Sequence, residues 1–262
     1  MSYALSPAGL KRLRDFVSPR SLLAFDVDGT LAPIVARPWD ARIPSELQRR
    51  LAAFTNRSTV AIITGRAVGD ARSMLEFNPA YLIGNHGCEG LPGFESDAGL
   101  YAAECTQWLE ELREENDAWR DTPGVTLEDK TYSLAFHYRH APRRDEALRV
   151  LEARAIRLEP RPRIIHGDCV LNLVPREAPH KGDALHTLLE HSGCARALYI
   201  GDDTTDEDVF RLDLPELLSV RVHQSDDTAA ELYLHGQEDV VKLLDAIERL
   251  LEASSIEKAA RR

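Results

Sequence analysis

The chain has 262 residues, of which 44% are hydrophobic and 29% charged, a composition typical of a folded globular protein and not of a disordered or fibrous chain. Its 43 acidic residues outnumber its 32 basic ones and give a net charge of −11, which argues against a nucleic-acid partner because such a partner requires a cationic surface. This average charge also repels anions, so a site for a phosphorylated ligand has to be made locally positive by Lys or Arg side chains, a metal ion or helix N-termini.

Cysteine usage and hydropathy bear on the location of the protein. The four cysteines are widely spaced and form no C-x-x-C pair, so we expect them to be reduced and structural. Charged residues interrupt the first 20 residues, and no uncharged apolar run is long enough to span a bilayer. We therefore expect a cytoplasmic protein without membrane association. The sequence does not predict the oligomeric state.

In chain order, residues 6–17 have a Ser cap, a Pro at the first helical position and helical apolar spacing, which predict a short helix. Residues 21–31 (SLLAFDVDGTL) are an apolar run that ends in Asp and Gly and predict a buried strand entering a turn. An amphipathic helix is expected over residues 43–54, and a second apolar strand over residues 58–66. These segments predict one βαβ unit.

The same alternation continues further along the chain. A helix is expected over residues 67–77, followed by a third apolar strand over residues 80–87. Residues 181–193 predict a helix closed by a glycine, and residues 197–203 and 217–223 predict two more buried strands. Strands that are apolar on both faces and alternate with helices are typical of a parallel sheet covered on both sides. We therefore expect an α/β fold with a doubly wound, Rossmann-like parallel sheet.

The pattern changes between about residues 100 and 170. An acidic helix is expected over residues 102–116, and residues 125–139 alternate between apolar and polar side chains, as in half-buried strands. This predicts a small α+β domain inserted between the third and fourth core strands. The expected boundaries are an N-terminal helix over 1–20, a core of 21–98 and 171–250, an inserted domain of 99–170, and a frayed tail of 251–262.

Polar residues follow four of the predicted core strands. In a doubly wound sheet, ligands bind beyond the carboxyl ends of the strands, so these residues are candidates for one site. The four segments are Asp26-Val27-Asp28-Gly29-Thr30, Thr64-Gly65-Arg66, Asn85-His86-Gly87, and Gly201-Asp202-Asp203-Thr204-Thr205-Asp206.

The acidic residues at these strand ends predict a metal site. Asp26 and Asp28 are two residues apart on an extended chain, so their side chains point the same way. With Asp202 arriving from another strand, such a cluster stays ionised only around a cation, and oxygen ligands beside a phosphate favour Mg²⁺. Asp203 and Asp206 are further candidates in the same run. A bare D-x-D is more often an Asp-Gly turn, but its position after an apolar strand favours the site.

The same positions carry the groups that phosphoryl transfer requires. We assign Asp26 as the nucleophile and Asp28 as the acid that protonates the leaving oxygen and then activates water. Thr64 offers a hydroxyl to a phosphoryl oxygen. Lys181 supplies a positive charge at the start of a helix. Taken alone, Lys181 would be interpreted as a solvated surface lysine, since lysine is rarely buried without a partner.

In this order, the motifs D-V-D-G-T-L, I-T-G-R, Lys181 and G-D-D-T-T-D resemble those of the haloacid dehalogenase superfamily of phosphatases. The inserted segment is similar to the C2B-type cap domain of its sugar phosphatases. More narrowly, four segments resemble the trehalose-6-phosphate phosphatase family, and the resemblance extends over residues 22–222. They are G-N-H-G-C-E, L-E-D-K-T-Y-S-L-A-F-H-Y-R, H-K-G-D-A-L and G-D-D-T-T-D-E-D-V-F.

The resemblance implies Mg²⁺-dependent hydrolysis of a small sugar phosphate, trehalose 6-phosphate, through an aspartyl-phosphate. It also implies that Glu128 and Lys130 hold sugar hydroxyls, with His137 and Arg139 on the same cap strand. Family members usually carry an acidic residue where this chain has Asn172, so the disaccharide contact loses a charge here. The expected substrate-binding residues are Gly65, Arg66, Asn85, His86, Glu128, Lys130, His137, Arg139 and Asn172.

Alternative functions remain open at this point. The same core could hydrolyse another sugar phosphate, such as sucrose 6-phosphate, or act as a phosphomutase. A D-x-D glycosyltransferase is an alternative from another class, but it does not explain Thr64, Lys181 or residues 201–206. A catalytically inactive sugar-phosphate sensor is disfavoured because no catalytic position is missing.

Overall fold

The computed structural model describes residues 1–35, 37–113 and 118–260, and the chain forms two compact units. The core unit comprises Met1–Pro92 and His180–Arg262, and the inserted unit comprises Gly93–Pro179. Within the described residues, no helix combines the length and apolar character that crossing a membrane requires.

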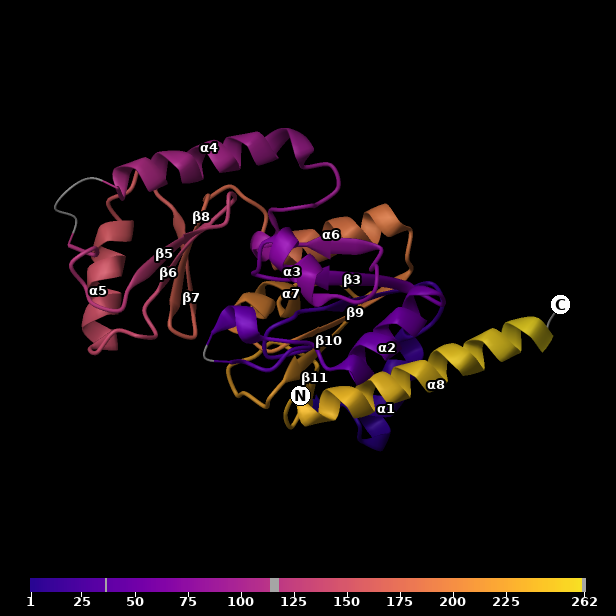
Figure 1. The fold of residues 1–262 in the computed structure, drawn as a ribbon. Helices are drawn as coiled ribbons and strands as arrows, with labels where there is room; N and C mark the ends of the chain where they lie inside the picture. The colour runs from indigo at the N-terminus through magenta and orange to yellow at the C-terminus, as the bar shows by residue number, and fades with distance from the viewer. Residues whose placement is uncertain (36, 114–117, 261–262) are drawn as a thin grey trace. The chain divides into compact units, whose positions relative to one another are not determined.

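The core unit is built on a seven-stranded sheet in which every strand pairing is parallel (Figure 1). The five expected core strands are confirmed, with β9 at the centre of the sheet and β2 beside it. The strand order is β1 (Ser2–Tyr3), β11 (Leu232–Leu234), β10 (Leu217–Val222), β9 (Arg196–Gly201), β2 (Ser21–Phe25), β3 (Thr59–Ile63) and β4 (Tyr81–Ile83).

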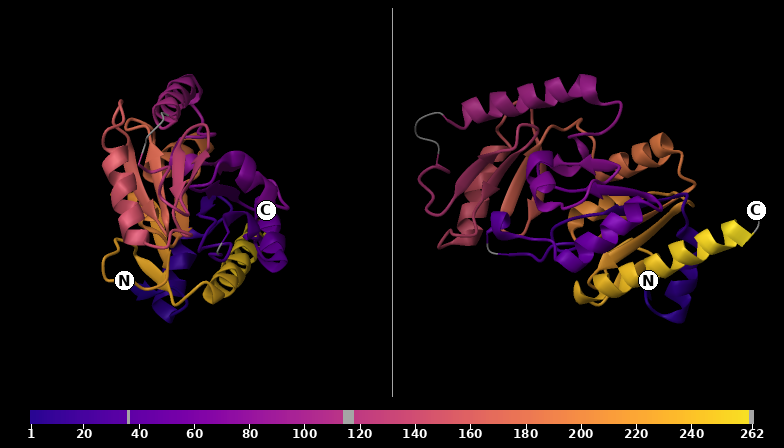
Figure 2. Two further views of the ribbon diagram at one scale, coloured as in Figure 1. Left: turned by 60° about the vertical axis from the view of Figure 1, so that its left-hand side comes forward. Right: turned by 45° about the vertical axis from the view of Figure 1, so that its right-hand side comes forward.

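Helices cover both faces of this sheet (Figures 1 and 2). Alternate residues of a strand point to opposite faces, so Leu23 and Phe25 of β2 join one apolar cluster with α1, α2 and α8. On the other side of the sheet, α6 contacts β2 and β3 and buries Leu185 and Leu188. The helices are α1 (Pro7–Phe16), α2 (Ser45–Thr55), α3 (Val68–Met74), α6 (Lys181–Ser192), α7 (Glu207–Phe210) and α8 (Glu238–Ala260), with short 3₁₀ turns η1 (Pro38–Asp40), η2 (Asn85–Gly87) and η3 (Thr204–Asp206).

The inserted unit has a four-stranded antiparallel sheet and two longer helices, α4 (Glu95–Glu111) and α5 (Arg144–Ala155). Its strand order is β5 (Thr126–Asp129), β6 (Leu134–His137), β8 (Val170–Val174) and β7 (Arg163–Gly167). One face of the sheet forms a core with the helices, in which Phe136 and Leu171 lie with Trp108 and Leu151. Ala135 and His137, which alternate with Phe136 along β6, therefore point to the other face.

The inserted sheet takes in a segment that the sequence analysis assigned to the core. Residues 171–174 lie in β8, which pairs with β6 and β7 of the inserted unit. Gly167 pairs with Val170, so the turn between β7 and β8 has only two residues, and β8 has to return beside β7. An apolar run such as L-N-L-V does not by itself distinguish the two sheets.

The chain ends also differ from the expectation. The N-terminal helix is shorter than residues 1–20, because Ser6 caps it by accepting a hydrogen bond from Gly9 N at 3.1 Å, and β1 precedes it. The tail expected over 251–262 is helical as far as Ala260, since no glycine or proline follows Gly236 to end α8. Residues 261–262, and residues 114–116 of the helix expected over 102–116, lie outside the described residues.

Candidate active site

The predicted catalytic residues of the core unit lie at one edge of the parallel sheet. Asp26 follows β2, Thr64 follows β3 and Asp202 follows β9, and these strands are neighbours in the order β9-β2-β3. The strand pairing continues into the site, because Asp26 N donates to Ile200 O at 2.9 Å. The expected meeting of separate chain segments at this edge is thus confirmed.

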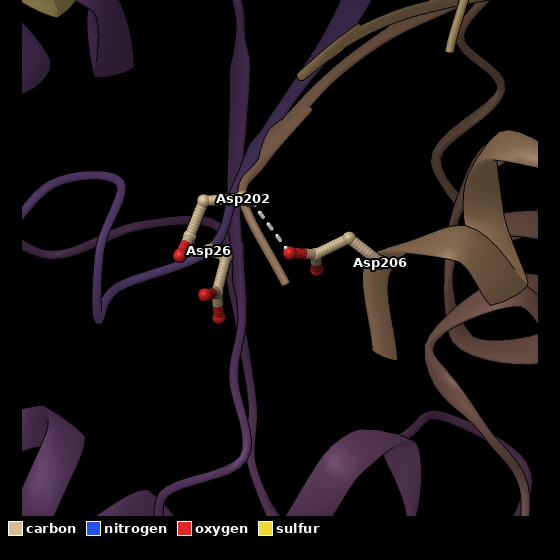
Figure 3. A group of neighbouring side chains, drawn as sticks. All are labelled: Asp26, Asp202 and Asp206. Carbon is tan, nitrogen blue, oxygen red and sulfur yellow. Dashed lines mark hydrogen bonds between the residues drawn. The ribbon is translucent and has the colours of Figure 1, made fainter. Parts of the chain in front are cut away.

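Three carboxylates converge here, those of Asp26, Asp202 and Asp206 (Figure 3). One oxygen from each lies within 4.8 Å of the others. The Thr30 hydroxyl donates to Asp202 Oδ1 at 2.9 Å and orients it. Gly29 has a φ of +81°, and a Cβ atom there would lie 2.0 Å from Asp202 Oδ2, so only glycine allows this approach.

Lys181 brings a buried positive charge to the site. It is the first residue of α6 and only 2% exposed, with its ammonium group 3.0 Å from Asp26 Oδ1 and 2.7 Å from Asp206 Oδ1. The interpretation of Lys181 as a solvated lysine is therefore wrong. A buried ammonium shared by two carboxylates brings fixed positive charge to the centre of an acidic chain.

The crowding of negative charge shifts the pKa of several groups. Burial raises the pKa of Asp26 well above its usual range, Lys181 acts against this, and the charges of Asp206, Asp202 and Asp28 add to it. Burial, followed by the charge of Asp206, raises the pKa of Asp202 to about 7. Burial alone would lower the pKa of Lys181, but Asp206 and Asp26 together raise it above its usual range. One ammonium group does not compensate this cluster, so an added cation is favoured there.

The donor atoms fit a hard divalent ion. All three converging ligands are carboxylate oxygens, and neither sulfur nor imidazole nitrogen joins this group among the described residues. Mg²⁺ is held in proteins by a few carboxylates and is commonly shared with a phosphate. The acidic cluster is therefore one that could bind such a metal ion.

Two other residues predicted as metal ligands have different partners. Both oxygens of Asp28 accept from the Arg66 guanidinium, from Nε and Nη2, each at 2.6 Å. Asp203 Oδ1 accepts from Thr204 N at 2.7 Å and caps the following 3₁₀ turn. Neither belongs to the three converging carboxylates, and their role as metal ligands stays a prediction.

The turns after β3 and β4 are interlocked. Asn85 N donates to Arg66 O at 2.7 Å, and His86 N donates to Thr64 O at 3.0 Å. Asn85 and His86 both have left-handed φ values, of 48° and 61°. The His86 ring lies against Gly65, where a Cβ atom would be 2.4 Å from the ring. The four residues expected around Thr64 are therefore brought together, and their contact with substrate stays a prediction.

Glu89 is a residue of this region that the sequence analysis missed. Its Oε2 accepts from Val68 N at 2.7 Å and from Asn85 Nδ2 at 2.8 Å, so it ties the two turns together. The signal in the sequence is an acidic side chain four residues after Asn85, close enough to return to the turn.

The remaining candidates lie in the inserted unit. Glu128, Ala135 and Asn172 are direct partners across β5, β6 and β8, so their side chains share the face opposite the apolar core. His137 Nε2 lies 2.7 Å from Glu128 Oε2. Lys130 lies in the turn between β5 and β6, and Arg139 Nη2 donates to Asp168 Oδ2 at 2.7 Å. Their role in sugar binding stays a prediction.

Tyr199 is the second residue that the sequence analysis missed. It is fully buried in β9, and its hydroxyl donates to Asp206 Oδ1 at 2.6 Å. A tyrosine inside an otherwise apolar buried strand signals a hydrogen-bond partner, because burying an unpaired hydroxyl is unfavourable.

A parallel sheet with a carboxylate, a hydroxyl and a second carboxylate at neighbouring strand ends, an ammonium at the start of a helix beside them, and an inserted α+β unit define the phosphatase fold of the haloacid dehalogenase superfamily. The family model described as trehalose-phosphatase matches residues 24–235. The chain therefore belongs to the trehalose-phosphatase family.

Individual relatives agree with this assignment. The chain is 31% identical over 209 residues to trehalose-phosphate phosphatase B of Arabidopsis thaliana, covering 73% of this chain. It is 33% identical over 196 residues, 71% of this chain, to the trehalose-phosphate phosphatase of Mycolicibacterium paratuberculosis. A solved trehalose-6-phosphate phosphatase of Aspergillus fumigatus is 27% identical and covers 97% of this chain and 100% of its own, with a TM-score of 0.60.

The chain spans only about half the length of the Arabidopsis and Mycolicibacterium relatives, 55% and 49% respectively. It is also 33% identical over 212 residues, 77% of this chain, to an uncharacterised glycosyl hydrolase of Mycobacterium tuberculosis, of which it covers 16%. The matching segment is thus shared by proteins of different total length.

Proposed function

We propose that the protein hydrolyses trehalose 6-phosphate to trehalose and phosphate, with Mg²⁺ as its cofactor and Asp26 as its nucleophile. The observation that carries the proposal is the pairing of Asp26 with the buried Lys181 ammonium at 3.0 Å, beside the carboxylates of Asp202 and Asp206. Membership of the trehalose-phosphatase family supports the choice of substrate.

The reaction has two steps. In the first, a carboxylate oxygen of Asp26 bonds to phosphorus while the bond from phosphorus to the sugar oxygen breaks, and Asp28 gives that oxygen a proton. In the second, Asp28 takes a proton from a water molecule whose oxygen attacks phosphorus, and the bond to Asp26 breaks. Both oxygens of Asp28 accept from Arg66, so proton transfer requires at least one of these hydrogen bonds to open.

Positive charge and hydrogen-bond donors stabilise the transferring group. Lys181 provides a permanent charge next to the nucleophile, and Thr64 a hydroxyl at the end of the neighbouring strand. Asp26 and Asp202 would hold Mg²⁺, and the Asp206 carboxylate, whose oxygens accept from donors of the chain, adds negative charge beside them. When bound, this ion offsets the negative charge of the carboxylates and of the phosphate.

Sugar selectivity is assigned to the inserted unit. The face that carries Glu128 and Asn172 offers an ionisable acceptor and an amide, and Lys130 adds a cation in the adjoining turn. Such groups bind hydroxyls by hydrogen bonds and leave the chemistry to the core unit.

Removing the metal is expected to stop catalysis. Treatment with EDTA should abolish phosphate release, and excess Mg²⁺ should restore it. Mg²⁺ at about 100 times its Kd should also stabilise the protein by about 2.7 kcal/mol in thermal unfolding, because it binds the folded state. Asp202→Asn is expected to lose this stabilisation. Full activity in EDTA would contradict the metal assignment.

Lys130→Ala is expected to separate sugar binding from chemistry. It should lower kcat/KM for trehalose 6-phosphate by about 10- to 100-fold, the worth of a hydrogen bond to a charged group, and leave p-nitrophenyl phosphate hydrolysis within about twofold. Lys11→Ala, in an exposed part of α1, is the matched control and should change neither. Equal losses on both substrates would rule out a role for Lys130 in sugar selection.

A substrate panel tests the proposal itself. Phosphate release is measured from trehalose 6-phosphate, sucrose 6-phosphate and glucose 6-phosphate, and the sugar products are identified. We expect free phosphate and the highest kcat/KM for trehalose 6-phosphate. An isomeric sugar phosphate would indicate a mutase, and preference for sucrose 6-phosphate would assign a different substrate.

A further inference from the structure

The carboxylate of Asp206 is fully occupied by donors from the chain itself. Its Oδ2 accepts from Asp202 N at 2.8 Å and from Asp203 N at 2.9 Å. Its Oδ1 accepts from Lys181 Nζ at 2.7 Å and from Tyr199 OH at 2.6 Å. A carboxylate has about four lone-pair sites, so these four donors fill it. Asp206 therefore acts as an anchor between the turn after β9 and the start of α6.

From this arrangement we propose that Tyr199 is a positioning residue, whose hydroxyl fixes Asp206 so that Asp206 and Asp26 share the Lys181 ammonium group. The proposal rests on the phosphatase function proposed above. Tyr199 does not touch the reacting atoms in this scheme and acts through Asp206 and Lys181.

The surroundings of Tyr199 fix where its hydroxyl lies. Its backbone pairs with Ala24 of β2 on one side and Ser219 of β10 on the other, and its ring packs edge-on against Phe210, with the centroids 6.0 Å apart. A Cβ atom at Gly201 would lie 2.3 Å from Asp206 Cγ, so the Asp206 carboxylate is seated directly against the strand. The tyrosine and its acceptor are thus held by the centre of the sheet.

Loss of the hydrogen bond from Tyr199 to Asp206 is expected to move the Lys181 ammonium group away from Asp26. Without Tyr199, Oδ1 of Asp206 keeps Lys181 as its remaining donor, and the carboxylate is free to turn about its Oδ2 contacts. The ammonium then follows Asp206 and is no longer held at 3.0 Å from Asp26. Charge placed for the transition state is lost, whereas the binding of the sugar is unchanged.

The chain contains a matched control for this experiment. Tyr3 OH donates to Asp239 Oδ2 at 3.0 Å, and the same carboxylate binds Lys242 Nζ at 2.6 Å. This is again a tyrosine, an aspartate and a lysine, but β1 is separated from β9 by β11 and β10. Tyr3→Phe therefore removes the same kind of hydrogen bond without touching the site.

The test compares Tyr199→Phe and Tyr3→Phe in the full chain. For Tyr199→Phe we expect kcat to fall about tenfold on both trehalose 6-phosphate and p-nitrophenyl phosphate, with KM within about twofold. For Tyr3→Phe we expect unchanged kcat and a smaller change in melting temperature, because its hydrogen bond is only partly buried. A Tyr199→Phe enzyme within twofold of the parent kcat, or an equal loss in Tyr3→Phe, would overturn the proposal.

A double-mutant cycle checks the route through Asp206. Tyr199→Phe should change kcat by less than about twofold once Asp206→Ala is present, because the acceptor of the Tyr199 hydroxyl is then absent. Full additivity would overturn the route. If Asp206→Ala does not fold, Asp206→Leu, which also lacks an acceptor, replaces it in the cycle with the same expectation.

Failure of the proposed phosphatase function can be distinguished from failure of the positioning role of Tyr199. If the parent hydrolyses p-nitrophenyl phosphate but not trehalose 6-phosphate, only the substrate is wrong, and the tyrosine comparison stands on the generic ester. If the parent hydrolyses neither, orthovanadate binding with Mg²⁺ is measured by calorimetry. Weaker binding in Tyr199→Phe than in Tyr3→Phe supports the positioning role, and equal binding overturns it.

Discussion

Asp26→Asn is expected to lower kcat by more than about 10⁴-fold while the protein stays folded. The amide is a poor nucleophile, so no bond from residue 26 to phosphorus forms. It has nearly the same shape as the carboxylate, and its oxygen still accepts from the Lys181 ammonium that lies 3.0 Å from Asp26 Oδ1. Because burial raises the pKa of Asp26, removing this carboxylate also removes a charge that folding disfavours at neutral pH.

The measurement combines phosphate release, thermal unfolding and trapping of a phosphorylated protein. The parent enzyme is expected to form an acid-stable, hydroxylamine-sensitive phosphoprotein, and Asp26→Asn none. Asp26→Ala guards against activity that returns through deamidation of the asparagine. Asp213→Asn, an exposed position between α7 and β10, is the control and should retain full activity. Substantial turnover by both residue 26 variants would mean that another group attacks phosphorus.

The sheet and its catalytic edge follow from local features of the sequence. Apolar runs such as S-L-L-A-F and T-V-A-I-I predict buried strands, and a parallel sheet places their carboxyl ends together. Asp26, Thr64 and Asp202 could therefore be assigned to one site before their distances were known. The helix of Lys181 was predictable as well, from its apolar spacing and the glycine that closes it.

What could not be predicted depends on contacts between distant segments. β1 has two residues and forms only by pairing with β11, about 230 residues further along the chain. The bidentate bond of Arg66 to Asp28 depends on how the turns after β2 and β3 are oriented. Tyr199 looks like one more residue of an apolar strand until Asp206 is placed beside it. Periodicity reports which face a residue lies on and not which partner it meets there.

Lys181→Met is expected to cause the largest loss of stability, about 3–5 kcal/mol at neutral pH, together with loss of activity. Methionine fills a similar volume but leaves the carboxylates of Asp26 and Asp206 buried without their shared ammonium. The free energy of unfolding is measured by urea denaturation. Lys242→Met is the matched control, because Lys242 also binds a buried carboxylate, Asp239, but is itself exposed and screened by solvent. We expect a cost of less than about 1 kcal/mol there.

The pH dependence of this loss identifies its cause. Burial raises the pKa of Asp26 above its value in the unfolded chain, and Lys181 is the group that counteracts this, so Lys181→Met raises it further. Lys181 also lowers the pKa of Asp202, which is raised to about 7 in the parent mainly by burial, so the loss of Lys181 raises that pKa as well. Parent and variant lose stability equally with rising pH up to the parent's folded pKa, and above it only the variant continues to lose stability, up to its own higher folded pKa. The deficit of Lys181→Met relative to the parent should therefore be smaller at pH 5 than at pH 8. A deficit that is the same at both values would indicate lost packing of the lysine side chain and not uncompensated charge.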